Sequence, residues 1–247
     1  MGEQNGKRRK QFEKISRKVG KTLQEYSMID PGDRILVGLS GGKDSMILLE
    51  ALVDRKRHLP FEFQLFAVHV GARGIGYQMD TDYLESFCQE LDVPLHLEEI
   101  EVDLSVEPKK APCFICSWNR RKRIFEMTRE LDCNKVALGH HRDDAIETVL
   151  MNMIYHGSIS SLPRDLTMFE GRIRLIRPLL YIPEKELTYY ATLRQFKKQE
   201  RTCPYEGSTR REEIRELVRT IDRLSRNARR NIFNAMDNIY GEYLPKK

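Results

Sequence analysis

The chain has 247 residues, of which 40% are hydrophobic, and this length is enough for one sizeable α/β core with a small appendage. No apolar stretch approaches the roughly 20 residues of a membrane span, and the N-terminus lacks the apolar core of a secretory signal, so we expect a cytoplasmic protein with no membrane partner. The net charge of +5 is unevenly distributed, because residues 7–21 hold eight Lys or Arg and residues 210–230 hold eight arginines. Basic ends of this kind favour a polyanionic partner larger than a nucleotide.

Short apolar runs alternate with longer segments of helical periodicity along the chain. Four of these runs are short and apolar enough for buried parallel strands: 35–39, 63–70, 95–100 and 135–139. A later run at 172–180 is expected to add an edge strand before a helix that starts near Pro183. The alternation predicts an α/β fold with a doubly wound, Rossmann-like parallel sheet, which binds ligands beyond the carboxyl ends of its strands.

A polar loop separates the first run from a helical segment at 46–52. The loop consists of Ser40, Gly41, Gly42, Lys43, Asp44 and Ser45. Adjacent glycines let backbone N–H groups approach anionic oxygens closely, and the helix N-terminus adds its positive dipole end. An ordinary Walker A loop does not fit, because Asp44 stands where a magnesium-binding hydroxyl belongs. A plain Gly-Gly turn would leave Lys43 and Asp44 unexplained, so the loop predicts a nucleotide site.

A cysteine pair, Cys113 and Cys116, lies in the middle of the chain, and Cys203 follows far downstream. Five cysteines without framework spacing indicate a reducing compartment and metal or redox use rather than disulfides. A structural zinc ion normally needs four ligands, whereas three thiolates suit a four-iron cluster with one open iron. A C-x-x-C redox couple and inert buried thiols remain open on spacing alone. Cys88 and Cys133 are expected to fill the core.

Residues 139–148 form a second polar segment directly after the fourth run. A helix that starts at Arg142 or Asp143 would place Asp143 and Glu147 on one face near its start, where carboxylates can bind Mg²⁺. The alternative is that these acids, with Asp144, only complement the helix dipole. The apolar residues that follow are expected to lie in the core: Val149, Leu150, Met153 and Ile154.

Two basic segments are candidates for the surface that binds a polyanionic partner. Residues 120–123 are four consecutive cations shortly after the cysteine pair, where they would place phosphate contacts next to the candidate cluster site. Further along, arginines recur every three or four residues between Arg211 and Arg230, with apolar residues on another face. Such a helix either faces phosphates or is a solvated helix whose arginines pair with Glu212, Glu216 and Asp222.

Five motifs, taken together and in this order, resemble those of one enzyme family. The loop at 40–45 fits the SGGxDS pyrophosphate loop of the PP-loop ATP pyrophosphatases, and residues 139–148 resemble the GHHxDD-x-x-ET element of that superfamily. With the cysteine pair, the run at 176–179 and a late cysteine before Gly207, their order is similar to that of the tRNA 2-thiocytidine synthetases, the TtcA family. The chain departs from the family at Glu206, where members often have a second late cysteine.

This resemblance implies a reaction in which ATP adenylates the C2 oxygen of a tRNA cytidine. Sulfur from a donor such as a cysteine desulfurase system then replaces that oxygen. Catalytic roles fall on Lys43, Asp44, Asp143 and Asp144, with Mg²⁺ on Asp44 and Asp143, and a [4Fe-4S] cluster falls on Cys113, Cys116 and Cys203. The implied ATP site comprises Leu39, Ser40, Gly41, Gly42, Lys43, Asp44, Ser45, His69, Gly139 and His140. Similar proteins commonly form homodimers.

We expect three parts in the chain. They are a basic N-terminal extension at 1–25, an ATP pyrophosphatase domain of the PP-loop/HUP type at 26–200, and a helical segment at 201–247 that carries the late cluster cysteine. Other functions stay open at this point: a PP-loop ligase, a thiolase acting on a different base, or a non-catalytic iron-sulfur RNA-binding protein. A ligase needs no cysteine triad, and pyrophosphate release in the presence of tRNA would exclude the non-catalytic alternative.

Overall fold

The computed structural model describes residues 2–74, 79–102, 112–197 and 210–244, and its contacts divide the chain into two units. Unit 1 comprises Met1–His141 and Arg164–Tyr205, and unit 2 comprises Arg142–Pro163 and Glu206–Lys247. The three-part division expected from the sequence stays a prediction. Within the described ranges, no helix combines the length and the apolar composition needed to cross a membrane.

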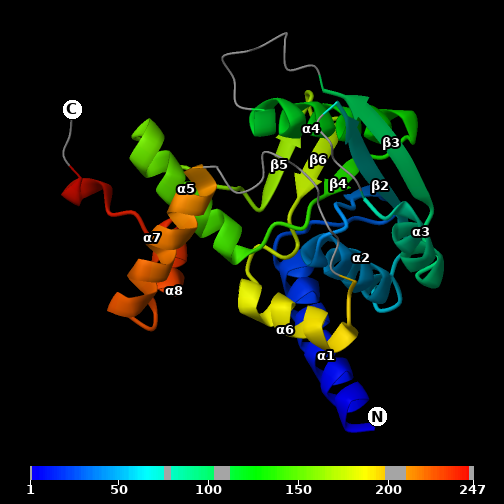
Figure 1. Ribbon diagram of the computed structural model, residues 1–247, viewed down its shortest axis with the longest axis horizontal. Coiled ribbons are helices and arrows are strands. Elements are labelled where there is room, and N and C mark those ends of the chain that lie inside the picture. The colour runs from blue at the N-terminus through cyan, green and yellow to red at the C-terminus, as the bar shows by residue number, and fades with distance from the viewer. Residues whose placement is uncertain (1, 75–78, 103–111, 198–209, 245–247) are drawn as a thin grey trace. The chain divides into compact units, whose positions relative to one another are not determined.

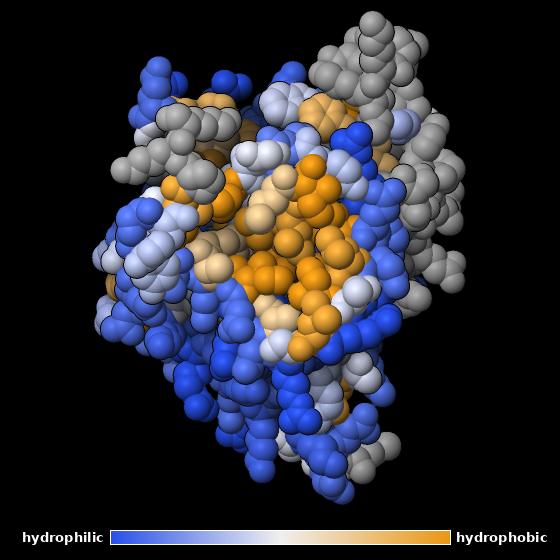
Figure 2. All heavy atoms as spheres, turned by 90° about the vertical axis from the view of Figure 1, so that its left-hand side faces the viewer, coloured by the Kyte–Doolittle hydropathy of each residue, from blue (hydrophilic) through white to orange (hydrophobic). Residues whose placement is uncertain are grey.

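The described part of unit 2 is helical. Its elements are α5 (Arg142–His156), α7 (Arg210–Leu224), α8 (Ala228–Ala235) and the short 3-10 helix η1 (Gly241–Tyr243), and α5, α7 and α8 pack on one another. Val149 is buried as expected, but Met153 and Ile154 are about half exposed, so their placement in the core is wrong. They lie in the last turn of α5, which the described residues leave uncovered. Figure 2 shows apolar side chains gathered in one patch on the face that it draws.

Unit 1 is built on a six-stranded sheet with the order β3-β2-β1-β4-β6-β5 (Figure 1). The strands are β1 (Arg34–Gly38), β2 (Gln64–Arg73), β3 (Leu95–Glu101), β4 (Lys135–Ala137), β5 (Asp165–Met168) and β6 (Ile173–Ile176). All pairings are parallel except that of β5 with β6, which confirms the expected fold class. The strand order reverses beside β1, and this switch point is where such sheets bind ligands.

One expected strand position is wrong. The run at 172–180 was expected to form an edge strand, whereas β6 lies between β4 and β5. The antiparallel strand β5 forms the edge instead, and its four partly exposed residues carry too weak an alternation to predict a strand.

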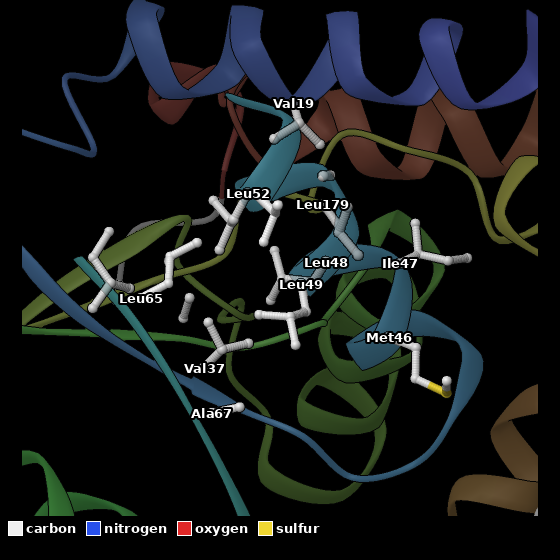
Figure 3. Close-up of a cluster of buried hydrophobic side chains, with 14 of the residues drawn as sticks. Val19, Val37, Met46, Ile47, Leu48, Leu49, Leu52, Leu65, Ala67 and Leu179 are labelled. Atoms are coloured by element: carbon white, nitrogen blue, oxygen red, sulfur yellow. The ribbon is translucent and has the colours of Figure 1, made fainter. Parts of the chain in front are cut away.

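Helices cover both faces of the sheet in unit 1. Successive side chains of each strand point to opposite faces, so each strand can pack against helices on both sides. Val37 of β1 packs in the cluster that contains α2, while Leu36 packs with Met127 on the opposite face. Figure 3 shows the first cluster, where Leu48 and Leu52 meet strand side chains. The helices of this unit are α1 (Gly2–Glu25), α2 (Lys43–Lys56), α3 (Thr81–Glu90), α4 (Pro112–Glu130) and α6 (Glu184–Arg194).

The basic N-terminal segment is the long helix α1. Its apolar residues Ile15, Val19 and Leu23 recur every four positions and are buried in the same cluster as α2. The helix packs against α2 and α6, and the Lys18 ammonium lies 2.7 Å from a carboxylate oxygen of Glu186 in α6. The N-terminal extension is therefore part of the core of unit 1, and most of its cations are exposed.

Candidate active site

The loop at 40–45 connects the carboxyl end of β1 to the start of α2 and is braced by its own serines. The Ser40 N–H donates to Ser45 Oγ at 3.1 Å, the Ser45 hydroxyl donates to the Gly42 carbonyl at 2.9 Å, and the Gly42 N–H donates to Ser40 Oγ at 3.3 Å. Gly41 has φ +73°, a left-handed conformation that side chains other than hydrogen disfavour. The two glycines and two serines therefore shape the loop before any ligand arrives.

Gly139 brings a second segment against this loop. A Cβ atom at Gly139 would lie 2.9 Å from the Ser45 nitrogen and 3.0 Å from the Asp44 carbonyl carbon. Both atoms are backbone, so a side chain at this position could not be accommodated by a rotamer change. The absence of a side chain at Gly139 thus lets the connection after β4 touch the N-terminus of α2, in the region where the sequence predicts the phosphate site.

Lys43 lies between two carboxylates at the start of α2. Its ammonium is 3.0 Å from Asp44 Oδ2 and 3.1 Å from Glu184 Oε1, at the start of α6. Burial opposes the charged form, but the two carboxylates outweigh it and hold the Lys43 pKa above its ordinary value. The ammonium therefore stays charged at neutral pH. Glu184 was missed by the sequence analysis, since an acid after Pro183 also suits an ordinary helix start.

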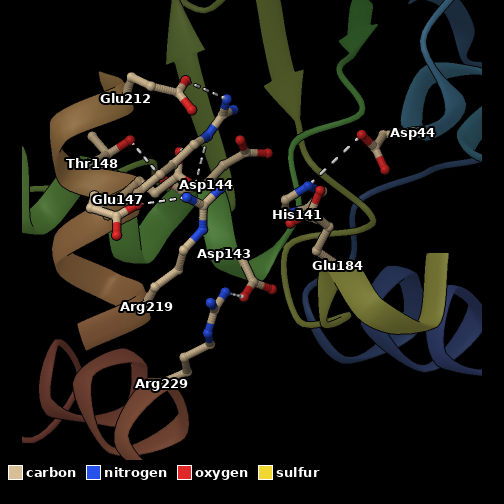
Figure 4. Close-up of polar contacts among 12 residues, drawn as sticks. Asp44, His141, Asp143, Asp144, Glu147, Thr148, Glu184, Glu212, Arg219 and Arg229 are labelled. Carbon is tan, nitrogen blue, oxygen red and sulfur yellow. Dashed lines mark hydrogen bonds and ion pairs between the residues drawn. The ribbon is translucent and has the colours of Figure 1, made fainter. Parts of the chain in front are cut away.

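His141 completes the polar surroundings of Asp44. Its Nε2 lies 3.8 Å from Asp44 Oδ2, and the ring is 5% exposed. Figure 4 marks the contact between His141 and Asp44 with a dashed line. The sequence motif contains two histidines, and the structure brings the second, His141, to Asp44. The first, His140, accepts a hydrogen bond at Nδ1 from the Arg177 guanidinium at 3.3 Å.

Arg177 is a buried cation next to His140. Burial lowers its pKa to about 10, and the neighbouring Arg121 adds to that shift. Two arginines from different elements of unit 1 thus concentrate positive charge near the ends of β4 and β6. A buried guanidinium whose charged form is disfavoured is stabilised by an anion, so this position is suited to a phosphate group.

His69 and Leu39 meet at the ends of β2 and β1. His69 is 3% exposed, and its Nδ1 lies 2.8 Å from the Leu39 carbonyl oxygen, so the ring donates its proton there. A pocket of about 480 Å³ opens beside this histidine and is lined by His69, Gly71, Ala72, Met79, Thr81, Leu97, Glu98 and Glu99. The resemblance places His69 and Leu39 in the implied ATP site, and the structure brings these two residues together.

In unit 2 the carboxylates at the start of α5 form ion pairs with arginines. Asp143, which is 3% exposed, accepts a hydrogen bond from the Arg229 guanidinium of α8, as Figure 4 shows. Glu147 lies 3.2 Å from Arg215 Nε of α7. Burial raises the pKa of Glu147, Arg215 opposes that shift, and Asp144 adds to it. Asp143 and Glu147 each have their own cation in this structure, so a shared magnesium site on α5 stays a prediction.

The cysteine pair lies in the first turn of α4. Cys113 and Cys116 are both partly exposed and not in a disulfide, whereas Cys203 lies outside the described residues. Cys88 and Cys133 are buried in the core as expected, and burial raises the pKa of each thiol to about 11. Among the described residues, no group of three or more His, Cys, Asp or Glu is placed to hold a metal ion. The pair on α4 comprises two of the three predicted cluster ligands.

The basic segment on α4 contains cations in two different environments. Arg123 is held by Glu98 at 2.9 Å and by Glu130 at 2.7 Å, which makes it a structural residue. Arg121 and Lys122 are exposed. On α7 in unit 2, Arg219 pairs with Glu216, which agrees with the solvated-helix alternative for that residue.

Comparison with known proteins identifies the class of protein that this fold and loop define. A sequence model of the PP-loop domain matches residues 11–221, so the chain belongs to the PP-loop family. Within that family it belongs with the tRNA-cytidine(32) 2-sulfurtransferases. The protein of that name from Paraburkholderia phytofirmans is 35% identical over 240 residues, which are 95% of this chain and 71% of the relative. The one from Paracidovorax citrulli is 35% identical over 236 residues, or 94% of this chain and 76% of the relative.

A solved structure supports the fold. The U34-tRNA thiolase NcsA from Methanococcus maripaludis, determined with its [4Fe-4S] cluster, matches with a TM-score of 0.77 at 24% identity. The match covers 96% of this chain and 81% of that chain.

Proposed function

We propose that this protein is an ATP-dependent tRNA sulfurtransferase that replaces the C2 oxygen of a tRNA cytidine with sulfur. The observation that carries this proposal is the braced loop at 40–45, which presents Lys43 and Asp44 at a helix N-terminus beside the switch point of the sheet. The family to which the chain belongs, the tRNA-cytidine(32) 2-sulfurtransferases, supports cytidine as the target base and tRNA as the partner.

The loop residues fit the phosphates of ATP. The C2 oxygen of the base would attack the α-phosphorus, and the bond to the β-phosphate oxygen would break with release of pyrophosphate. Lys43 stabilises the charge that develops on the leaving group, together with the helix N-terminus. The Asp44 carboxylate suits Mg²⁺, because hard cations prefer oxygen ligands. Gly139 supports this site by allowing close contact between the two segments.

The remaining residues of the ATP site receive supporting roles. We assign the nucleoside to the pocket beside His69, since its apolar and carboxylate lining suits a base and ribose hydroxyls. His140 and the buried Arg177 would bind an anion at the neighbouring strand ends. Asp143 and Asp144 stay proposed acidic residues of the reaction, with Asp143 as a magnesium ligand. That role requires Asp143 to exchange Arg229 for the metal.

The cysteine pair suits a cluster site. Cys113 and Cys116 are partly exposed, and their spacing of three residues places both thiolates on one turn of α4. With Cys203 they would bind a [4Fe-4S] cluster, which would supply an open iron for the incoming sulfur. The sulfur attacks C2 of the adenylated base, the bond between C2 and oxygen breaks, and that oxygen leaves with AMP. A cysteine desulfurase system is our proposed sulfur donor, and the cytoplasm is the proposed location because the tRNA substrate and reduced thiols occur there.

We also propose a homodimer that uses unit 2. The exposed apolar and aromatic side chains of its described part are Met153, Ile154, Ile159, Leu217, Leu224, Ile239, Tyr240, Tyr243 and Leu244. Apolar patches of the kind seen in Figure 2 often mark interaction sites. Replacing Met153 and Ile154 with lysine should convert a dimer to a monomer in light scattering. A monomeric wild-type protein would exclude this part of the proposal.

The test of the proposed function uses the anaerobically reconstituted protein. With ATP, Mg²⁺ and tRNA it should release pyrophosphate, and Asp44→Ala should abolish that release while keeping the iron content of the wild type. The two sites use different residues, so this separation is expected. Full turnover by Asp44→Ala would contradict the assignment of the loop.

A further inference from the structure

We propose that α4 carries a stacking platform for an unpaired tRNA base, formed by Trp118 with Arg121 and Lys122 beside it. This inference rests on the proposed function, because it takes tRNA as the partner. Trp118 is 59% exposed and Phe114 is 52% exposed. They are four residues apart, so they occupy one helix face. An exposed tryptophan is uncommon, and this one is the single tryptophan of the chain.

The charge around the ring favours a nucleotide. Arg121 and Lys122 follow Trp118 by three and four residues, which places both within one turn of the ring, and both are exposed. The first fourteen residues of α4, 112–125, contain four consecutive cations and no acid. The two acids of the helix, Glu126 and Glu130, lie within reach of Arg123. A base on the ring would therefore have cations near its phosphate, the combination by which proteins bind single-stranded nucleic acid.

The same charges argue against a protein partner at this face. Lysine is depleted at protein interfaces, whereas here the exposed Lys122 lies one helical turn from the aromatic ring, in a run of four consecutive cations. The apolar side chains of unit 2 form a better candidate for that role.

Helical geometry also indicates which base the platform holds. Each residue advances about 100° around a helix, so Trp118 lies about 160° from Cys116 and about 140° from Cys113. The ring thus faces away from both thiols. A base stacked on Trp118 is accordingly a neighbour of the reacting cytidine. The platform contributes to tRNA binding and to the position of the tRNA on the protein. Trp118 does not touch the reacting atoms.

The single tryptophan allows a direct test. Titration of the full-length holoprotein with unmodified tRNA should quench the Trp118 fluorescence in a saturable manner. Trp118→Ala should weaken tRNA binding by roughly tenfold or more, in line with the loss of one base stack, while Trp118→Phe should retain most of the affinity. Tyr189→Ala is the matched control, because Tyr189 is a 50% exposed aromatic residue on α6 of the same unit. ATP affinity should be unchanged in all three variants.

The outcomes separate this inference from the proposed function. If the wild type thiolates tRNA but Trp118→Ala binds tRNA as tightly as the wild type, the platform is refuted and the function stands. If Trp118→Ala loses self-association rather than tRNA affinity, the face is a protein contact and the platform is also refuted. Absence of tRNA binding by the wild-type holoprotein would overturn both proposals.

Discussion

Gly139→Ala tests how closely the two segments of the active site depend on each other. An ordinary Cβ contact begins at 3.4 Å, whereas the added Cβ would lie 2.9 Å from the Ser45 nitrogen, so the backbone must separate by about 0.5 Å. Overpacking of this kind costs typically 1–3 kcal/mol of folding free energy. The displaced atoms belong to the loop that carries Lys43 and Asp44. Since misplacements of about 1 Å can reduce rates by about 100-fold, we expect kcat to fall by about 10- to 100-fold.

The assay combines urea unfolding with pyrophosphate release in the presence of tRNA. Gly6→Ala is the matched control, because Gly6 lies in helix α1 and a Cβ there meets nothing within 4 Å. It should leave kcat unchanged and stabilise the fold by up to about 1 kcal/mol, the difference in helix propensity. Wild-type kcat and stability in Gly139→Ala would refute the argument that the loop and the connection after β4 touch as described.

Three further predictions follow from single contacts. Burial raises the pKa of Glu147, so the contribution of this residue to stability is greatest below its ordinary pKa of 4.5 and is lost as the pH rises through the folded-state pKa. Glu147→Gln should therefore flatten the decline of the unfolding free energy above pH 4.5. An unchanged pH profile would contradict this prediction. Cys113→Ala should abolish the binding of about four iron atoms per chain, whereas Cys88→Ala should retain them, and iron analysis distinguishes the two. Arg121→Ala should reduce the slope of log K for tRNA binding against log salt concentration by about one, the contribution of one phosphate contact. Arg123→Ala removes the partner of Glu98 and Glu130 and should leave that slope unchanged. The reverse pattern would assign phosphate binding to Arg123.

The sequence predicted features that depend on local spacing. These features are the loop at 40–45, the first four strands and the burial of Cys88 and Cys133. They could be predicted because their residue types and spacing follow from local backbone requirements. Gly139 was predicted as part of the site from its motif alone. Its physical role became visible only when the structure placed it against Asp44 and Ser45.

Contacts between distant residues could not be read in the same way. Glu184 lies 141 residues from Lys43, and its position after a proline predicts only a helix start. Arg229 lies 86 residues from Asp143, so the arginine at this carboxylate depends on the packing of α8. The exposure of Met153 also depends on which neighbours cover the last turn of α5, which periodicity does not reveal.

The central claim is that the chain uses ATP to replace oxygen with sulfur on a tRNA cytidine. The most direct measurement is mass spectrometry of nucleosides from unmodified tRNA after anaerobic incubation with the reconstituted protein, ATP, Mg²⁺ and inorganic sulfide. The account predicts 2-thiocytidine with a matching release of AMP, and neither product with Asp44→Ala. Formation of AMP and pyrophosphate with tRNA but without any thiolated nucleoside would contradict it and favour a PP-loop ligase.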